Sequence, residues 1–265
     1  MRFDFLSSIV LMLVYMVSAS AHAQDMMRHV DLTSPDMTQA EFTRDEVVQA
    51  LGTATPAHPA DFAGKRLNGL DLSGLDLSKA NFRAARLNNV NFANANLEGA
   101  VFDQAWMLRA NLNGANLKGA QLFQSQLVGA RLDGADLSGA RVAADLSRAS
   151  LKGAKLVGAN LSADMKNQSM GLMRGVLMSA DLEGADLAEA NLSRVNFEFA
   201  NLRDANLSGA NLMGAELGGA DLRGANIARA NFDNADVESA RLADLKGTES
   251  SNLDRARNLS GAIRD

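Results

Sequence analysis

The sequence predicts an all-β fold in which short extended segments wind into a solenoid, and three observations support this. An apolar residue returns every five positions across residues 62–242, usually with an alanine two positions before it. Residues 20 positions apart are often of one type, as with Phe62, Phe82 and Phe102. The chain has 22 glycines, only 3 prolines and 5% aromatic residues, which suits a narrow interior of small side chains. Such self-similarity outweighs the usual expectation of one or two globular domains for this length.

The five-residue period matches neither an α-helix nor a simple β-strand. In an extended segment, residues i and i−2 face the same way, so the large apolar residue and the preceding alanine both point inward. The other positions carry mostly Asp, Asn, Gly and Ser, which tolerate turn geometry. Four such sides would close a coil of about 20 residues, with successive coils about 4.8 Å apart. Phe62, Phe82 and Phe102 should therefore stack as a ladder of rings.

Tandem copies of one five-residue pattern carry a resemblance to a known family. Four copies are ANLEG at residues 95–99, ANLNG at 110–114, ANLKG at 115–119 and ANLSG at 205–209. The pattern resembles that of the pentapeptide-repeat family, and the resemblance implies a right-handed quadrilateral β-helix. It covers about two-thirds of the chain, with 36 repeat centres and hence about nine coils over residues 61–246.

The first 23 residues have the features of a secretory signal peptide. Arg2 precedes an apolar run over residues 5–17, and Ala21 and Ala23 place cleavage before Gln24. The alternative is an uncleaved membrane anchor, but the run is shorter than the roughly 20 apolar residues that span a bilayer. We therefore expect a periplasmic or secreted protein with no stable membrane anchor after cleavage. The chain contains no cysteine, which excludes disulfides, thiolate metal sites and cysteine catalysis.

Residues 24–60 are expected to form a polar lead, a capping helix and a linker. Thr43 and Glu46 have the spacing of a capping box, which predicts a helix over residues 44–51 closed by Gly52. The prolines of residues 53–59 indicate a linker before the first coil. Such a segment would cover the open end of a solenoid.

Residues 247–265 are expected to form a second cap. Asn252 is a plausible helix N-cap, and Leu253, Ala256 and Leu259 would share one helical face, with Gly261 as the stop. The sequence therefore predicts a helix of one to two turns over the last coil.

The repeat breaks twice, and the two breaks compensate. Val142 is followed by the next centre, Leu146, after four residues, and Leu161 is followed by Leu172 after eleven. Because a one-residue slip changes which side chains face the core, the sequence predicts a shortened side near residues 143–144 and a bulge or loop within residues 162–170.

Methionines gather at the second break, at Met165, Met170, Met173 and Met178. Methionine is flexible and fills irregular gaps or forms an adaptable contact surface, and this is the favoured interpretation. The alternative is a thioether site for Cu(I), since soft ligands select soft metals. No other metal ligands and no cofactor are predicted.

Trp106 precedes the centre Met107 and should face outward, where a tryptophan can contact a partner or lie flat on neighbouring side chains. The many Asp and Asn residues before the centres follow from the repeat, and we assign no general acid or base among them. With no nucleophile, base and orienting group in one constellation, the sequence does not indicate an enzyme.

Charge is uneven along the repeats. Residues 61–175 carry 14 Lys or Arg and 9 Asp or Glu, whereas residues 176–246 carry 6 and 12. This charge asymmetry is evidence about binding partners or end-to-end self-association, and it is not evidence about the fold. The leading hypothesis is an exported, non-enzymatic scaffold that binds protein, with no nucleic acid partner. The alternatives are the copper-binding protein and, by family resemblance, a DNA mimic that modulates a type II topoisomerase, which the signal peptide disfavours.

Overall fold

The computed structural model describes residues 30–55, 57–163 and 173–264. By its internal contacts, the chain divides into Met1–Ser34 and Pro35–Asp265. In the first unit, the Asp31 carboxylate accepts hydrogen bonds from the Thr33 amide at 2.9 Å and from its hydroxyl at 2.6 Å. The predicted signal peptide and its cleavage site lie outside the described residues. Among those that are described, no helix is long and apolar enough to cross a membrane.

Two helices precede the coils in the second unit. The short α2 spans Pro35–Thr38 and α3 spans Arg44–Thr53. The predicted capping box is confirmed, because the Thr43 hydroxyl accepts from the Glu46 amide while the Glu46 carboxylate accepts from the Thr43 amide at 2.7 Å. The predicted end at Gly52 is wrong, since the helix continues to Thr53 and is capped by extended Ala54. An added Cβ at Gly52 would meet nothing within 4 Å and the φ of this residue is not positive, so nothing at this position forces a stop.

α3 and its neighbours cover the interior of the first coil. Val47 is fully buried and belongs to the same apolar cluster as the coil centres. The Phe42 ring meets the Phe62 ring edge-on, with centroids 5.9 Å apart. α2 is held by two buried asparagines, because Asn68 donates to the Asp36 carbonyl at 3.0 Å and Asn88 donates to the Met37 carbonyl at 3.1 Å.

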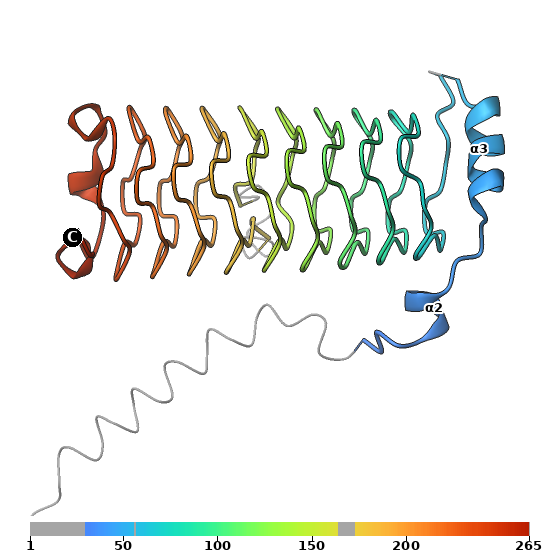
Figure 1. The fold of residues 1–265 in the computed structure, drawn as a ribbon, viewed down its shortest axis with the longest axis horizontal. Helices are drawn as coiled ribbons and strands as arrows, with labels where there is room; N and C mark the ends of the chain where they lie inside the picture. Colours follow the sequence, from blue (N-terminus) through green and yellow to red (C-terminus); the bar gives the residue numbers. More distant parts are fainter. Residues whose placement is uncertain (1–29, 56, 164–172, 265) are drawn as a thin grey trace, which may run out of the picture. The chain divides into compact units, whose positions relative to one another are not determined.

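The repeats form a β-helix whose coils stack in register (Figure 1). Bridges are parallel and mostly join residues 20 apart, as between Asp61 and Asn81. The Phe62 amide donates to the Asn81 carbonyl at 2.7 Å, and the Asn81 amide donates to the Ala60 carbonyl at 2.9 Å. We call the ladder from Asp76 to Lys246 the fourth side; it consists of Asp76, Asn96, Asn116, Asp136, Lys155, Asp186, Asn206, Asn226 and Lys246. The described coils pair through single bridges and not long strands, because the chain turns every five residues.

The interior holds one large and one small side chain per side, as predicted. Phe62, Phe82 and Phe102 are buried and stack with centroids 5.3 Å and then 5.0 Å apart. The alanines two positions before the centres, such as Ala80, are equally buried. Stacked rings and tightly packed alanines give an interior with no room for a second large residue per side.

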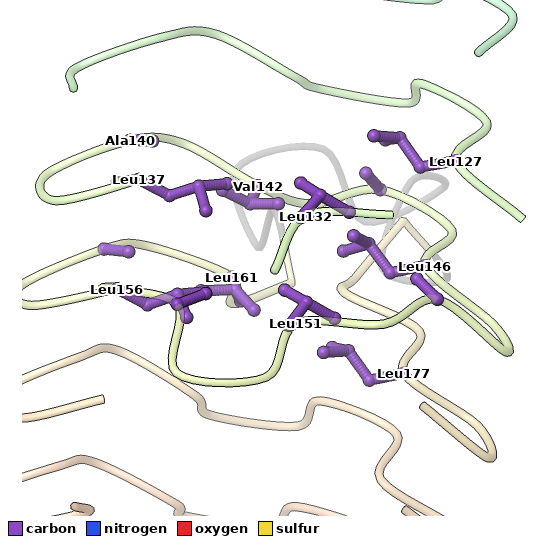
Figure 2. Close-up of a cluster of buried hydrophobic side chains, with 14 of the residues drawn as sticks. Leu127, Leu132, Leu137, Ala140, Val142, Leu146, Leu151, Leu156, Leu161 and Leu177 are labelled. Carbon is purple, nitrogen blue, oxygen red and sulfur yellow. The ribbon is translucent and has the colours of Figure 1, made fainter. Parts of the chain in front are cut away.

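The shortened side is confirmed, and Figure 2 shows the leucines of the coils around it. Gln126 pairs with Asp145, a spacing of 19 residues, while Asp145 pairs with Val176, a spacing of 31. Leu146 is fully buried, so the slip keeps an apolar residue inside. The longer insertion closes where the Gly175 amide donates to the Leu161 carbonyl at 2.8 Å. Most of the loop predicted within residues 162–170, and the centre predicted at Leu172, lie outside the described residues.

The predicted C-terminal helix is wrong, because the chain forms three short 3₁₀ helices: η2 at Thr248–Ser250, η3 at Leu253–Arg255 and η4 at Leu259–Gly261. Asn252 does not cap η3 through its side chain. Its carboxamide oxygen accepts from the Phe232 amide at 2.6 Å and its nitrogen donates to Asn231 at 2.8 Å. These two hydrogen bonds hold Asn252 against the preceding coil. The C-terminal segment therefore packs on that coil and does not form a separate helix.

Candidate functional site

The most varied outer surface follows one ladder of bridges, which we call the second side. Its residues are Arg66, Arg86, Trp106, Gln126, Asp145, Val176, Asn196, Glu216, Asp236 and Arg257. Along the repeats, each of these residues is followed by a buried centre and then by two turn residues before the next side begins. Because every coil contributes one set, substituents along the second side lie about 4.8 Å apart.

The early half of the second side is basic. Arg66 is paired with Asp36 at 2.7 Å, and Arg86 lies over the Trp106 ring with its guanidinium carbon 5.9 Å from the centroid. Arg109 and Arg148, at the second turn position, are exposed and make no ion pair within the described part of the chain. This half therefore presents two guanidinium groups to solvent.

Trp106 faces outward, as predicted, and it is half-buried. Its contact with Arg86 corresponds to the arrangement in which the ring lies against neighbouring side chains. A role in contacting a partner stays a prediction.

Two of the four clustered methionines can be placed. Met173 is half-buried with its sulfur against the Gln124 carboxamide, and Met178 is half-buried at the first turn position after Val176. Met165 and Met170 lie outside the described residues, so the thioether site for Cu(I) stays a prediction. No group of three or more His, Cys, Asp or Glu side chains within the described ranges is arranged to hold a metal ion.

The late half of the second side is acidic and hollowed. A hollow of about 290 Å³ is lined by Glu198, Phe199, Glu216, Gly218, Gly219, Asp236, Glu238 and Ser239. Phe199 is 67% exposed, the most exposed large apolar side chain among the described residues. Gly218 and Gly219 are the only adjacent glycines in the sequence, and they leave the turn of the middle coil without side chains.

The carboxylates of the hollow fall into two pairs. Glu216 is held by Arg174, whose two terminal nitrogens donate to the two carboxylate oxygens at 2.8 Å and 2.7 Å. Asp236 lies 3.6 Å from an Arg257 nitrogen. Glu198 and Glu238 have no cationic partner among the described side chains. The hollow therefore carries uncompensated negative charge at Glu198, whose side chain borders Gly218, while the Glu238 carboxylate lies over Gly261 in the following coil.

The aspartates of the repeats are engaged in turns. The pKa of Asp76 lies below its ordinary value because the Ser78 hydroxyl and amide donate hydrogen bonds to its carboxylate. The pKa of Asp221 is lowered chiefly by the Arg223 side chain, whose Nε donates at 2.8 Å. Asparagines at the same position link coils, as where Asn91 donates to Asp71 at 2.8 Å. These contacts give the Asp and Asn residues a structural role in the repeat.

The stacked four-sided coils and their buried leucine and alanine rows define a tandem-repeat β-solenoid. The family model for pentapeptide repeats matches in 8 copies, over residues 66–104, 109–139, 144–163, 180–217 and 205–244. The chain therefore belongs to the pentapeptide-repeat family, and this membership implies a right-handed β-helix.

Several solved structures are similar to this chain. HetL, a pentapeptide repeat protein involved in heterocyst differentiation regulation from the cyanobacterium Nostoc sp. strain PCC 7120, is 30% identical over 84% of this chain and 97% of its own, with a TM-score of 0.41. QnrB1, a plasmid-mediated fluoroquinolone resistance protein, is 18% identical over 76% and 91%, with a TM-score of 0.37. Rfr23 from the cyanobacterium Cyanothece 51142 is 27% identical over 46% and 91%, with a TM-score of 0.28. A comparison with curated proteins found no match.

Sequence reasoning missed the hollow around Phe199. The sequence does contain two indications of it, namely the adjacent glycines and a phenylalanine at a turn position that glycine or a polar residue usually occupies. Their importance depends on Glu198 and Glu238, which lie 20 residues to either side of Gly218.

Proposed function

We propose that this protein is an exported, non-enzymatic solenoid that binds another protein along its second side. The observation that carries the proposal is the division of that side into two oppositely charged halves. Arg109 and Arg148 are exposed without ion-pair partners in one half of the described side, and Glu198 and Glu238 lack cationic partners in the other. Complementary charge favours fast encounter and a fixed orientation of a protein partner.

The rigid coils support a binding role. Outward residues are fixed at a defined height by backbone hydrogen bonds to a neighbouring coil, as at Phe199, whose amide donates to the Gly218 carbonyl at 2.9 Å. A surface held in this way loses little conformational entropy when it binds. The turn hydrogen bonds to Asp76 and Asp221 support a structural and non-catalytic role for the repeat carboxylates.

Crosslinking in intact cells tests the binding proposal. We expect a discrete crosslinked partner that is lost when Arg109→Glu and Arg148→Glu are combined. The matched control combines Lys79→Glu with Lys155→Glu, which makes the same charge change at outward residues of the fourth side and its turn. Absence of any crosslinked partner, or equal loss in both double variants, would contradict the proposal.

Export has a separate test. The mass of the protein recovered from the periplasm or medium should correspond to a chain that begins at Gln24. A protein recovered from the cytoplasm with Met1 still present would rule out export and leave the binding proposal to the crosslinking result.

A further inference from the structure

We propose that the hollow beside Phe199 binds one cationic side chain, an arginine or lysine, of a basic segment in a partner protein. The proposal rests on the proposed protein-binding function and deepens it, because it names the part of the second side that makes contact and the chemistry of what it contacts.

The hollow follows from three consecutive turns of the second side. Residues 198–199 are Glu-Phe, residues 218–219 are Gly-Gly and residues 238–239 are Glu-Ser. The outer turns project side chains while the middle turn projects none. Two coil spacings of about 4.8 Å separate the flanking turns by roughly 10 Å, which admits a flat guanidinium group or the aliphatic part of a lysine.

The Phe199 ring forms one wall of the hollow. The residue has a φ of 58°, and its ring leans over Gly219, where an added Cβ would lie 2.7 Å from a ring carbon. Gly219 is therefore needed for the ring to lie where it does. The ring leaves 67% of the residue exposed, and an aromatic face beside carboxylates attracts a cation.

The charges select a cation as the occupant. Glu198 and Glu238 line the hollow without cationic partners among the described residues. The Glu238 carboxylate lies over Gly261 in the following coil, so Glu198 is the carboxylate beside the glycine pair that lacks a cationic partner. Glu216, between them in the stack, already binds the Arg174 guanidinium through both oxygens. The same chain thus shows that a carboxylate lining the hollow binds a guanidinium group in the paired geometry that arginine favours.

Another contact in this chain shows an arginine lying against a phenylalanine ring. Arg141 places its guanidinium carbon 4.6 Å from the centroid of the Phe123 ring, on another side of the solenoid. A partner arginine in the hollow would combine the two contacts, lying against Phe199 while it donates to Glu198. Because such a contact needs an extended, accessible side chain, the occupant that we infer is a basic peptide segment.

Fluorescence anisotropy with the purified protein tests the inference. The probe is a labelled hexapeptide, acetylated and amidated, with two arginines among glycines; the same peptide with glutamines in place of the arginines is the probe control. Phe199→Ala should weaken binding of the arginine peptide by about 3- to 30-fold, in line with a desolvated cation–π contact. Glu198→Gln should weaken it severalfold and reduce its dependence on salt.

Gly218→Leu offers a test that leaves Phe199 and all carboxylates in place. An added Cβ at Gly218 meets nothing closer than 3.8 Å and the φ of this residue is not positive, so a leucine fits the backbone and fills the hollow. We expect it to weaken peptide binding at least as much as Phe199→Ala. Ala188→Leu is the matched control, because Ala188 has the same turn position on the fourth side. Glu249→Gln in η2 controls for the loss of one negative charge.

Equal binding of the arginine peptide by all variants, or equal binding of the glutamine peptide, would overturn the inference. Sedimentation measurements add a further outcome: if Phe199→Ala abolishes self-association while the peptide never binds, the occupant is a second copy and the inference is wrong. The crosslinking experiment separates this result from the broader proposal. Crosslinking to a partner could be lost in the Arg109 and Arg148 variant but retained in Gly218→Leu. That result would support the proposed protein-binding function and overturn the inference about the hollow.

Discussion

Phenylalanines of this solenoid lie on either side of its wall, and an early ladder and one late residue show the contrast. In the early coils, Phe62, Phe82 and Phe102 stack inside the solenoid. In the late coils, Phe197 and Phe232 are buried as well, but Phe199 lies outside, over Gly219 and beside Glu198. One repeat can therefore vary its interior to gain stability and its turns to form a binding surface, because the two sets of positions are separated by the backbone.

The largest expected effect distinguishes the two kinds of phenylalanine. Phe82→Ala should lower the free energy of unfolding by about 3–5 kcal/mol, because it leaves a cavity between two stacked rings. Phe199→Ala should change it by less than about 0.5 kcal/mol, since the residue is exposed. Urea unfolding followed by circular dichroism measures both. Similar losses in the two variants would show that Phe199 contributes to the core.

A smaller effect compares two glycines with the same backbone conformation. Gly139 and Gly219 both have a φ of 65°, but an added Cβ meets nothing at Gly139 and the Phe199 ring at Gly219. Gly139→Ala should cost about 1 kcal/mol for the left-handed conformation, and Gly219→Ala should cost more. Adding Phe199→Ala should bring the cost of Gly219→Ala down to that of Gly139→Ala in a double-mutant cycle. An unchanged cost would show that the ring does not depend on Gly219.

The smallest effect concerns two aspartates, Asp76 in an early coil and Asp221 in a late one. Both have a pKa below the ordinary value, so each contributes stability that is present above the unfolded pKa and is lost as pH falls through the folded pKa. Unfolding measured from pH 6 downward should therefore show decreasing stability below about pH 4. Asp76→Asn should reduce the decrease, because asparagine can accept the same amide hydrogen bond without titrating.

Salt distinguishes these two aspartates. The chief contact of Asp221 is the Arg223 guanidinium, whereas that of Asp76 is the uncharged Ser78 hydroxyl. Added salt should weaken the Asp221 contribution more than the Asp76 contribution. Equal salt sensitivity in Asp221→Asn and Asp76→Asn would contradict this assignment.

Much of the fold could be predicted because the repeat is local. The five-residue spacing identified the buried centres, the phenylalanine ladder and the shortened side before Leu146, since each depends on a short stretch of chain. Thr43 and Glu46 predicted the start of α3 for the same reason. The ends were less predictable: helix α3 passes Gly52, and the C-terminal segment forms 3₁₀ helices because Asn252 bonds to the coil before it.

By itself, the sequence determined which residues of each side point inward, because strand alternation and a fixed period leave one consistent arrangement. The tertiary structure decided what the outward residues do. Phe199 lies over Gly219, and Arg174 reaches Glu216 across 42 residues of chain. Such contacts form between coils that lie one or two steps apart, and the direction of an outward side chain depends on the space that the next coil leaves for it. The glycine pair became a hollow only once its neighbours were stacked on either side.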